Sequence, residues 1–512
     1  MLESQLVATL LCLGTIHCAQ ILMITLGGTR SHKVPFLALG RGLVSMGHQV
    51  TLVSPFSQDD HSLVEEVTPR MVEEAVISYS KLDMLGPKLR GDMPFKLWDI
   101  FDYVSSVCDA FYTDPASQLL LSRRVDLLVL DGAFPECTLA LVHHFHAPFI
   151  YLNTVAFYSN QFSLAGNPTM YSTTPFFDSY HTDRMSFWER SLNGVLHVLA
   201  RGVVLFMNKF YLEPIIRKHF RDDVPSIDSI GRNVSLILQN GHHSVTHPRP
   251  FLPGVVEIAC IHCKNPKPLS KELEEFIMGG NKKGFVFVSF GTSVHSSQFP
   301  ERLRLLMVEA FSKLPYHVLW KFVVEGDTMP DLPDNVQLGR WLPQQDLLGH
   351  PQMLAFVNHG GLHSIIEGVY HGVPMVTMPV FGDHSANSRK AEVDGYSVTL
   401  DLHTVTAATL LAAINRVIDD SSYKKNVEYR SLLLRDQPQP PLDRALYWVE
   451  YVLRHQGAPH LQSAAKDLSF IQYFMLDTIA AALVAFYVLV LVMRIVWRKS
   501  FGRRKFKNLK RE

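Results

Sequence analysis

Short apolar runs that end in glycine and lead into helical patterns constrain the fold of this chain most strongly. The first unit covers residues 20–55, where the run Ile21–Leu26 ends at Gly27 and Gly28. Apolar residues then recur at helical spacing, and Val50–Val53 is a second apolar run. A strand, a glycine turn, a helix and another strand in this order predict a βαβ unit of a parallel sheet covered by helices.

The same pattern restarts near residue 282, so the 512 residues predict two α/β domains. The run 282–294 is followed by an expected helix at 301–313, and apolar runs at 353–357 and 374–380 continue the alternation. The Pro-rich segment before residue 270 is the expected linker. The predicted boundaries are 21–265 for the N-terminal domain, 266–445 for the C-terminal domain and 446–473 for a helical return and juxtamembrane segment.

The N-terminus, residues 1–20, is predicted to be a secretory signal peptide. Its apolar run Leu6–Ile16 has the length of an h-region, and small residues follow it. The n-region holds Glu3 and no Lys or Arg, so a buried first strand is the alternative.

An apolar stretch predicts a transmembrane helix at 474–497. Thr478–Met493 contains no charged residue, and about twenty apolar residues span a bilayer. The tail 498–512 is rich in Lys and Arg, which predicts a cytosolic tail and a lumenal or external main body. A buried core helix with a basic tail is the alternative. The two ends together predict a single-pass type I membrane protein of the secretory pathway.

Composition narrows the function classes. Hydrophobic residues make up 47% and charged residues 19%, which suits a large core, and the net charge of zero gives no reason to expect nucleic acid. Asn233 begins the open sequon NVS and is a predicted glycan site. Cys260 and Cys263 form a CxxC, but no second pair completes a metal site, so no metal is expected. The histidines at 143–146 are read as a surface turn rather than a metal cluster.

Residues at the carboxyl ends of the second-half strands form the expected binding site. His359, Gly360 and Gly361 follow a strand and open a helix, where backbone N–H groups and the helix N-terminus favour an anion. His359 and Ser364 can donate to phosphate oxygens, and the carboxylate of Glu367 suits a diol such as ribose. The same His-Gly-Gly could alternatively be no more than a tight turn.

Two further strand ends extend this site toward a nucleoside diphosphate. The hydroxyls of Thr292 and Ser293 can reach the same phosphates, and the ring of Trp341 can stack on a base. The pair Asp383-His384 faces the group that the second phosphate carries. The residues with these expected roles are Gly291, Thr292, Ser293, Trp341, Gln344, Asp383 and His384. The chain has no GxGxxG, no GxxxxGK[ST] and no DxD, which argues against dinucleotides, P-loop chemistry and a metal-held diphosphate.

The segment 341–384 resembles the signature of the membrane-bound UDP-glycosyltransferases, the UDP-glucuronosyltransferase superfamily. The likeness covers nearly the whole chain and includes SFGTSV, TRSHKV and VLDGAFP. It implies two facing Rossmann-like domains of GT-B type, the first for the acceptor and the second for the UDP-sugar, with no metal and no cofactor besides this co-substrate. It also adds Leu342 and His363 to the expected donor site, and it implies residence in the endoplasmic reticulum.

The resemblance implies that His32 is the general base and Asp131 its partner carboxylate. His32 would take the proton of an acceptor hydroxyl, whose oxygen attacks the anomeric carbon while UDP leaves with inversion. The expected acceptor is small and lipophilic. A non-catalytic membrane protein that binds a UDP-sugar or lipid is the rival, although binding alone needs neither His32 nor Asp131. Homo-oligomer formation stays open.

The pair Asp383-His384 departs from the Asp-Gln of most of the family and is similar to the ceramide galactosyltransferase branch. It predicts a preference for UDP-galactose or UDP-glucose, with galactose as the first choice and UDP-glucuronic acid as the alternative. The apolar segment 183–215, for its part, predicts a long helix that caps an acceptor site, rests on the membrane or belongs to the core.

Overall fold

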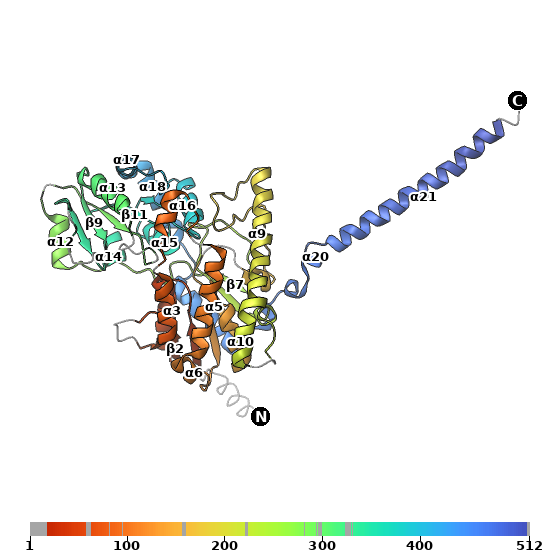
Figure 1. Cartoon of the computed structure of the whole chain (residues 1–512), viewed down its shortest axis with the longest axis horizontal. Coiled ribbons are helices and arrows are strands. Elements are labelled where there is room, and N and C mark those ends of the chain that lie inside the picture. Colours follow the sequence, from red (N-terminus) through yellow and green to blue (C-terminus); the bar gives the residue numbers. More distant parts are fainter. Residues whose placement is uncertain are drawn as a thin grey trace, which may run out of the picture. The chain divides into compact units, whose positions relative to one another are not determined.

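The computed structural model describes residues 18–57, 63–80, 82–94, 96–155, 160–220, 224–280, 282–292, 294, 299–322, 329 and 331–508. Most of the predicted signal peptide, as well as Ser293, lies outside these described residues. The chain divides into two compact units, Met1–Gln462 and Ser463–Glu512 (Figure 1).

The first unit begins with a sheet of seven parallel strands in the order β3-β2-β1-β4-β5-β6-β7. These strands are β1 (Gln20–Ile24), β2 (Gln49–Val53), β3 (Glu65–Val67), β4 (Leu127–Asp131), β5 (Phe149–Asn153), β6 (Leu236–Gln239) and β7 (Val255–Glu257). Every residue of β4 and β5 is buried, because helices cover both faces of the sheet. The predicted βαβ opening is confirmed.

Helices of several lengths join these strands. They are α2 (Arg30–Ser45), α3 (Arg70–Ser80), α4 (Leu85–Arg90), α5 (Leu97–Thr113), α6 (Pro115–Leu120), a 3₁₀ turn (Glu136–Thr138), α7 (Leu139–Phe145), α8 (Asn160–Leu164), α9 (Phe187–Met207), a π-helical stretch (Asn208–Leu212), α10 (Glu213–Phe220) and α11 (Ile227–Gly231). The histidines at 143–146 end α7, and His144 is exposed, so the predicted surface turn is confirmed.

A second sheet has six parallel strands in the order β10-β9-β8-β11-β12-β13. These are β8 (Phe285–Ser289), β9 (His317–Lys321), β10 (Val336–Gly339), β11 (Met353–Asn358), β12 (Met375–Thr377) and β13 (Ser397–Thr399). The helices around it are α12 (Lys271–Met278), α13 (Glu301–Ser312), α14 (Gln344–Leu348), α15 (Leu362–Tyr370), α16 (His384–Val393), α17 (Ala407–Asp419) and α18 (Ser421–Arg435). One face packs on α13 and α17 and the other on α12, α14 and α15, which gives the two α/β domains predicted (Figure 1).

Two segments cross between the domains. Helix α19 (Pro441–Arg454) follows the second domain but packs in the core of the first, beside α2. The sequence-based boundary at residue 445 therefore falls inside this helix. In the opposite direction, Leu85 and Leu89 of α4 pack in the core of the second domain, and His403 Nδ1 lies 3.0 Å from the Leu89 carbonyl oxygen. A 3₁₀ turn (Pro459–Leu461) then ends the first unit.

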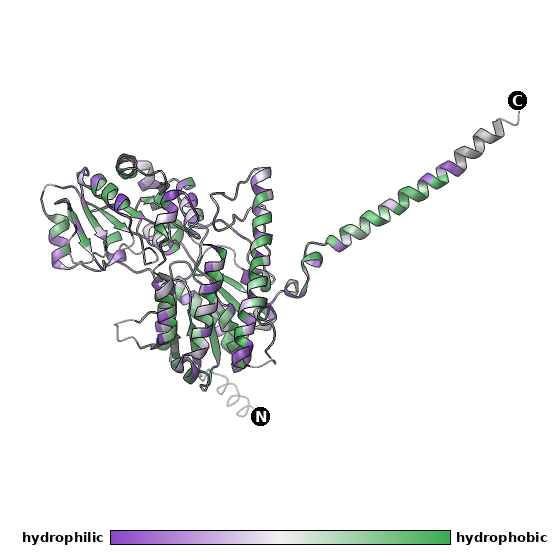
Figure 2. Ribbon diagram, in the orientation of Figure 1, coloured by the Kyte–Doolittle hydropathy of each residue, from purple (hydrophilic) through white to green (hydrophobic). Residues whose placement is uncertain are grey.

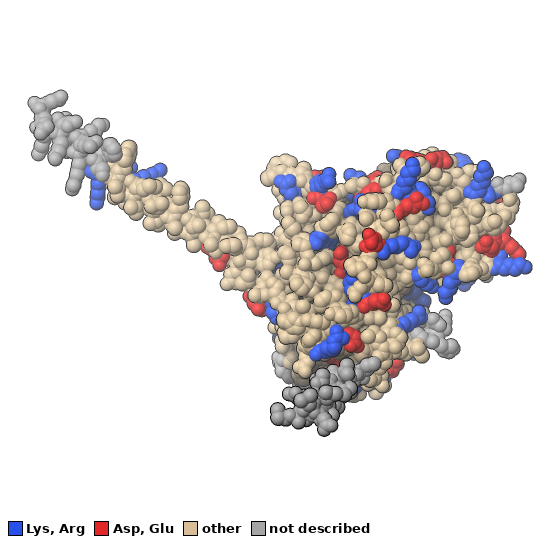
Figure 3. Space-filling model, turned by 180° about the vertical axis from the view of Figure 1, so that it is seen from behind, with Lys and Arg blue, Asp and Glu red and all other residues tan. Residues whose placement is uncertain are grey.

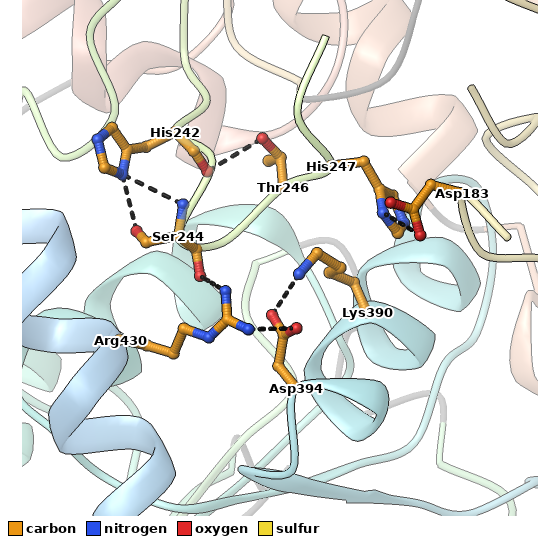
Figure 4. A network of polar contacts seen from close by, with 8 residues as sticks. All are labelled: Asp183, His242, Ser244, Thr246, His247, Lys390, Asp394 and Arg430. Atoms are coloured by element: carbon orange, nitrogen blue, oxygen red, sulfur yellow. Dashed lines mark hydrogen bonds and ion pairs between the residues drawn. The ribbon is translucent and has the colours of Figure 1, made fainter. Parts of the chain in front are cut away.

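A network of ion pairs in the second domain is connected by one hydrogen bond to the loop after β6 of the first domain (Figure 4). Arg430 of α18 donates to Asp394 Oδ1 at 2.7 Å and to the carbonyl oxygen of Ser244, in the loop after β6, at 3.4 Å. Lys390 of α16 forms a second ion pair with the same aspartate. The side chain of Asp394 is 6% exposed, so one buried carboxylate stands between two cations.

Helix α9 exposes an apolar face. Only Asn193, His197 and Met207 of its 21 residues are buried, so the alternative that places this segment in the core does not hold for most of α9, whereas Leu212 of the following π-helical stretch lies in the core of the first domain. The exposed apolar residues of α9 are Phe187, Trp188, Leu192, Val195, Val198, Leu199, Leu205 and Phe206. Much of the α9 ribbon has the colour of hydrophobic residues (Figure 2). The continuous helical stretch Phe187–Phe220 is also long and apolar enough to pass a test for a membrane span, with 22% of its most apolar window buried.

The second unit contains a 3₁₀ turn (Ala464–Asp467), α20 (Phe470–Tyr473) and α21 (Leu476–Asn508). The part Leu476–Lys499 has a mean hydropathy of 2.6 over its most apolar window and is long and apolar enough to cross a membrane. No residue of that window is buried in the described structure, which contradicts the alternative of a core helix. Neutral side chains cover the middle of α21, and basic ones follow toward its end (Figure 3).

Candidate active site

His32 and Asp131 come together although 99 residues separate them. His32 is the third residue of α2, and Asp131 ends β4, which pairs with β1 in the middle of the sheet. The two side chains meet at 3.0 Å between His32 Nδ1 and Asp131 Oδ2. A hydrogen on Nδ1 facing the carboxylate leaves Nε2 free to accept a proton.

Asp131 is buried and held by several donors. Thr25 Oγ1 donates to Oδ2 at 2.8 Å, while Thr154 Oγ1 and the Ala133 N–H donate to Oδ1 at 3.1 and 3.0 Å. The side chain is 2% exposed, against 15% for His32. These hydrogen bonds fix the position of the carboxylate and, through it, the orientation of the imidazole ring.

The pKa of His32 is raised above its ordinary value. Burial alone would lower this pKa, but the charge and hydrogen bond of Asp131 outweigh burial, and the charge of Asp383 adds to them. Asp383 belongs to the second domain, at the start of α16. A carboxylate of the second domain therefore contributes to the electrostatic surroundings of a histidine of the first domain.

Gly28 allows the loop before α2 to pass close to the ring of His32. A Cβ atom at this position would lie 2.7 Å from the imidazole, and the φ of 75° favours glycine. The glycine loop therefore sets the position of the ring.

In the second domain, the ring of His359 is enclosed by two glycines. A Cβ at Gly291, after β8, would lie 2.5 Å from the His359 ring, and one at Gly361 would lie equally close. Burial lowers the pKa of His359 to about 3, and the charge of Lys321 adds to this, so the imidazole is neutral at pH 7. His359 Nδ1 and Thr292 Oγ1 are buried without a hydrogen-bond partner among the described residues, and both suit phosphate oxygens.

Lys321 is a cation at this edge that the sequence reasoning missed. It ends β9 beside β8, donates to the Gly291 carbonyl at 3.1 Å, and lies 4.6 Å from the centre of the Trp341 ring. The parallel pairing of β9 with β8 would have located it, because both strands end at the same edge. Trp341 is 69% exposed, so its ring remains open to stacking.

Glu367 lies in the second turn of α15 and accepts several hydrogen bonds. Gln344 Nε2 lies 2.5 Å from its Oε2, while Gln345 Nε2 and His262 Nε2 lie 3.2 and 3.0 Å from its Oε1. The sequence reasoning missed His262 and Gln345. Neither follows a recognisable strand-end pattern, and His262 is 105 residues away in the chain.

Asp383 and His384 are both connected to the loop His359–Gly361, Asp383 through Asn387 and His384 through a contact with the His359 ring. Asn387 Nδ2 donates to Asp383 Oδ2 at 3.0 Å and to the Gly360 carbonyl at 3.1 Å. The rings of His384 and His359 pack edge to face with centroids 4.5 Å apart. Burial, together with the charges of His359 and Lys88, keeps the pKa of His384 well below its ordinary value, so this imidazole is neutral too.

The other expected donor residues differ in how they can act. His363 packs 4.9 Å from the His262 ring, and Ser364 is buried in the first turn of α15. The side chain of Leu342 lies in the core of the second domain, so only its backbone can face a ligand. Among the described residues, no group of three His, Cys, Asp or Glu is placed to hold a metal ion.

Comparisons with known proteins show which family this chain resembles over most of its length. Residues 46–511 match a family described as "UDP-glucoronosyl and UDP-glucosyl transferase". The chain is 33% identical to a UDP-glycosyltransferase, UGT5, of Dactylopius coccus, over 89% of this chain and 86% of that one. It is also 31% identical to two proteins of Mus musculus. The match to a 2-hydroxyacylsphingosine 1-beta-galactosyltransferase covers 95% of this chain and 90% of that protein, and the match to UDP-glucuronosyltransferase 1A9 covers 96% of this chain and 95% of that protein.

Solved structures show the same fold. The glycotransferase of kitacinnamycin superimposes with a TM-score of 0.59 at 19% identity, covering 85% of this chain and 99% of that one. CalG4, the calicheamicin glycosyltransferase, superimposes with a TM-score of 0.54 at 17% identity, covering 86% of this chain and 99% of that one. The predicted GT-B architecture is confirmed.

Proposed function

The chain belongs to the UDP-glucuronosyl and UDP-glucosyl transferase family and is a UDP-sugar glycosyltransferase. We propose that it transfers a hexosyl or glucuronosyl group to a hydroxyl of a small lipophilic acceptor. The contact between His32 and Asp131 at the domain interface carries this proposal. The proposed reaction is a single inverting displacement that needs no metal.

In the proposed step, His32 Nε2 accepts the proton of the acceptor hydroxyl as its oxygen attacks the anomeric carbon. The C–O bond to UDP breaks on the opposite face of that carbon, and the bonding electrons leave with the diphosphate. Asp131 stabilises the imidazolium that forms. Neutral donors such as His359 and Thr292, with the cation of Lys321, would stabilise the charge that grows on UDP.

The lipophilic acceptor is proposed from the apolar surface of the first unit. Helix α9 exposes eight large apolar side chains, which suit either the entry of an apolar molecule or contact with lipid. The rival, a protein that only binds a UDP-sugar or lipid, leaves the buried His32–Asp131 contact without a purpose, because binding alone does not need a base.

The donor sugar is proposed to be galactose or glucose, because His384 replaces an amide with a rigid imidazole. Its Nδ1 accepts from the Phe381 N–H at 3.4 Å, which leaves Nε2–H as a donor. An amide at this position would offer a donor and an acceptor together. Lys88 of α4 acts electrostatically on His384 and could instead pair with a glucuronate carboxylate. The relatives include galactosyl, glucosyl and glucuronosyl transferases, so the test compares all three donors.

Competition between UDP-galactose, UDP-glucose and UDP-glucuronic acid at equal concentrations tests the function and the donor together. With a panel of phenols, sterols and ceramides, and with EDTA present, the wild type is expected to release UDP and to prefer a neutral hexose. His384→Gln is expected to shift the ranking toward glucuronic acid by about tenfold, the value of one hydrogen bond to a charged group. Failure to release UDP with any acceptor contradicts the enzyme, and an unchanged ranking removes His384 as the selector.

The proposed location is the endoplasmic reticulum membrane, with the first unit in the lumen and residues 498–512 in the cytosol. The exposed side chain of Asn233 is accessible for a glycan on the lumenal side. Protease added to intact microsomes is expected to remove only the basic tail and to leave a core that shifts in mass with an endoglycosidase. Adding detergent should make the lumenal part of the chain accessible to the protease as well. Digestion of the main body without detergent would contradict this topology.

A further inference from the structure

A disulfide-closed turn presents a buried histidine to Glu367. Cys260 and Cys263 are bonded to each other, with their Cα atoms 4.9 Å apart, and the Cys263 N–H donates to the Cys260 carbonyl at 2.9 Å. His262 lies inside this small ring with a side chain only 2% exposed. Its Nε2 is 3.0 Å from Glu367 Oε1. The turn therefore aims one imidazole at one carboxylate.

Both domains hold this turn in place. Ile261 is buried in the core of the first domain, while Cys260 packs in the core of the second. Cys260 adopts a φ of 71°, a left-handed conformation that residues other than glycine rarely take. The disulfide and the two cores together maintain a backbone shape that the sequence alone does not favour.

Further contacts connect the turn to the donor side of Glu367. Gln345 accepts from the Lys264 N–H at 2.9 Å and donates to the His262 carbonyl at 3.3 Å, while its amide also reaches Glu367. The His262 ring packs against His363 with centroids 4.9 Å apart, which restricts its rotation. With Gln344 on Oε2 and with His262 and Gln345 on Oε1, both oxygens of the Glu367 carboxylate are held, and their remaining lone pairs have a fixed direction.

We propose that His262, fixed by the Cys260–Cys263 disulfide, is a positioning residue that orients Glu367 toward the hydroxyls of a nucleoside diphosphate. This inference rests on the proposed function and on the expectation from the sequence that Glu367 binds the ribose diol of the donor. His262 acts through Glu367 and needs no contact with the ligand. Loss of His262 should therefore weaken a ligand with ribose hydroxyls more than the same ligand without them.

The test compares UDP with 2′,3′-dideoxyuridine diphosphate by calorimetry on the full chain in detergent. His262→Ala is expected to weaken UDP about tenfold, the value of one hydrogen bond to a charged group, and to leave the dideoxy ligand within about twofold. His262→Gln is expected to retain UDP affinity, because its amide can donate to the same carboxylate oxygen. A merely structural role would weaken both ligands equally.

The role of the disulfide is tested by the double variant Cys260→Ser, Cys263→Ser. This variant should also lose affinity for UDP while keeping its affinity for the dideoxy ligand. The matched control is Cys108→Ala, Cys137→Ala, which removes the other disulfide, within the first domain, and should leave both affinities unchanged. If the Cys260 variant does not fold, the two His262 variants decide. Unchanged UDP affinity in His262→Ala, or equal losses for both ligands, overturns this proposal alone, whereas failure of the wild type to bind UDP overturns the proposed function as well.

Discussion

Replacement of His32 by alanine is expected to lower kcat for glycosyl transfer by about 10²- to 10⁴-fold, the range for loss of a positioned general base. The alanine variant keeps the glycine loop and the fold of α2, but no group remains to accept the acceptor proton. Asp131 cannot replace it, because Thr25 and Thr154 occupy its oxygens and its side chain is 2% exposed. The measurement is the rate of acceptor-dependent UDP release.

The pH profile gives the same prediction a second readout. The base acts in its neutral form, and its pKa is raised, so the wild-type rate should fall as the pH drops through this raised value. Asp131→Asn removes the charge that raises the pKa and should move the inflection to lower pH. His144→Ala, at an exposed histidine of α7, is the control and should keep the wild-type rate and profile. Full activity of His32→Ala would remove the proposed base.

Replacement of Asp394 by asparagine is expected to cost about 3–5 kcal/mol of stability, as the removal of one partner from a buried ion pair does. The change keeps the size of the side chain but leaves Lys390 and Arg430 without their shared carboxylate (Figure 4). Because Arg430 also bonds the Ser244 carbonyl, the contact between the domains should loosen as well. Thermal unfolding of the full chain in detergent measures the effect as a lowered midpoint.

An exposed ion pair provides the control for this stability prediction. Glu309 and Lys313 pair at 2.7 Å on α13, with side chains 58% and 54% exposed, and such pairs contribute about 0–1 kcal/mol. Glu309→Gln should therefore leave the unfolding midpoint nearly unchanged. Equal midpoints for Asp394→Asn and the wild type would show that the buried network does not contribute the expected stability.

Strand ends made most of the architecture predictable. Parallel strands place their carboxyl ends at one edge of the sheet, so His359, Gly291 and Asp131 could be assigned to such edges from the order of apolar runs. The pairing of His32 with Asp131 needed the resemblance to a known family, because the sequence separation of 99 residues carries no local signal. The structure then added the hydrogen bonds around Asp131 and the direction in which the pKa of His32 is shifted.

Other features depend on tertiary packing that no local pattern expresses. Helix α19 returns to the first domain, although its sequence continues the helices of the second. The apolar residues of α9 have the same helical spacing whether they face a core or the surface, so periodicity could not show their exposure. His262 was missed because a CxxC pattern directs attention to the cysteines, while the contact with Glu367 belongs to one of the two residues between them.

Parallel measurement of UDP binding and acceptor-dependent UDP release, on the same preparations of the wild type and His32→Ala, tests the central claim most directly. The claim assigns donor binding to the second domain and the base to the first. It predicts that the two proteins bind UDP with affinities within about twofold, while release by the variant falls at least about 100-fold. Equal rates of UDP release by the two proteins would contradict the account.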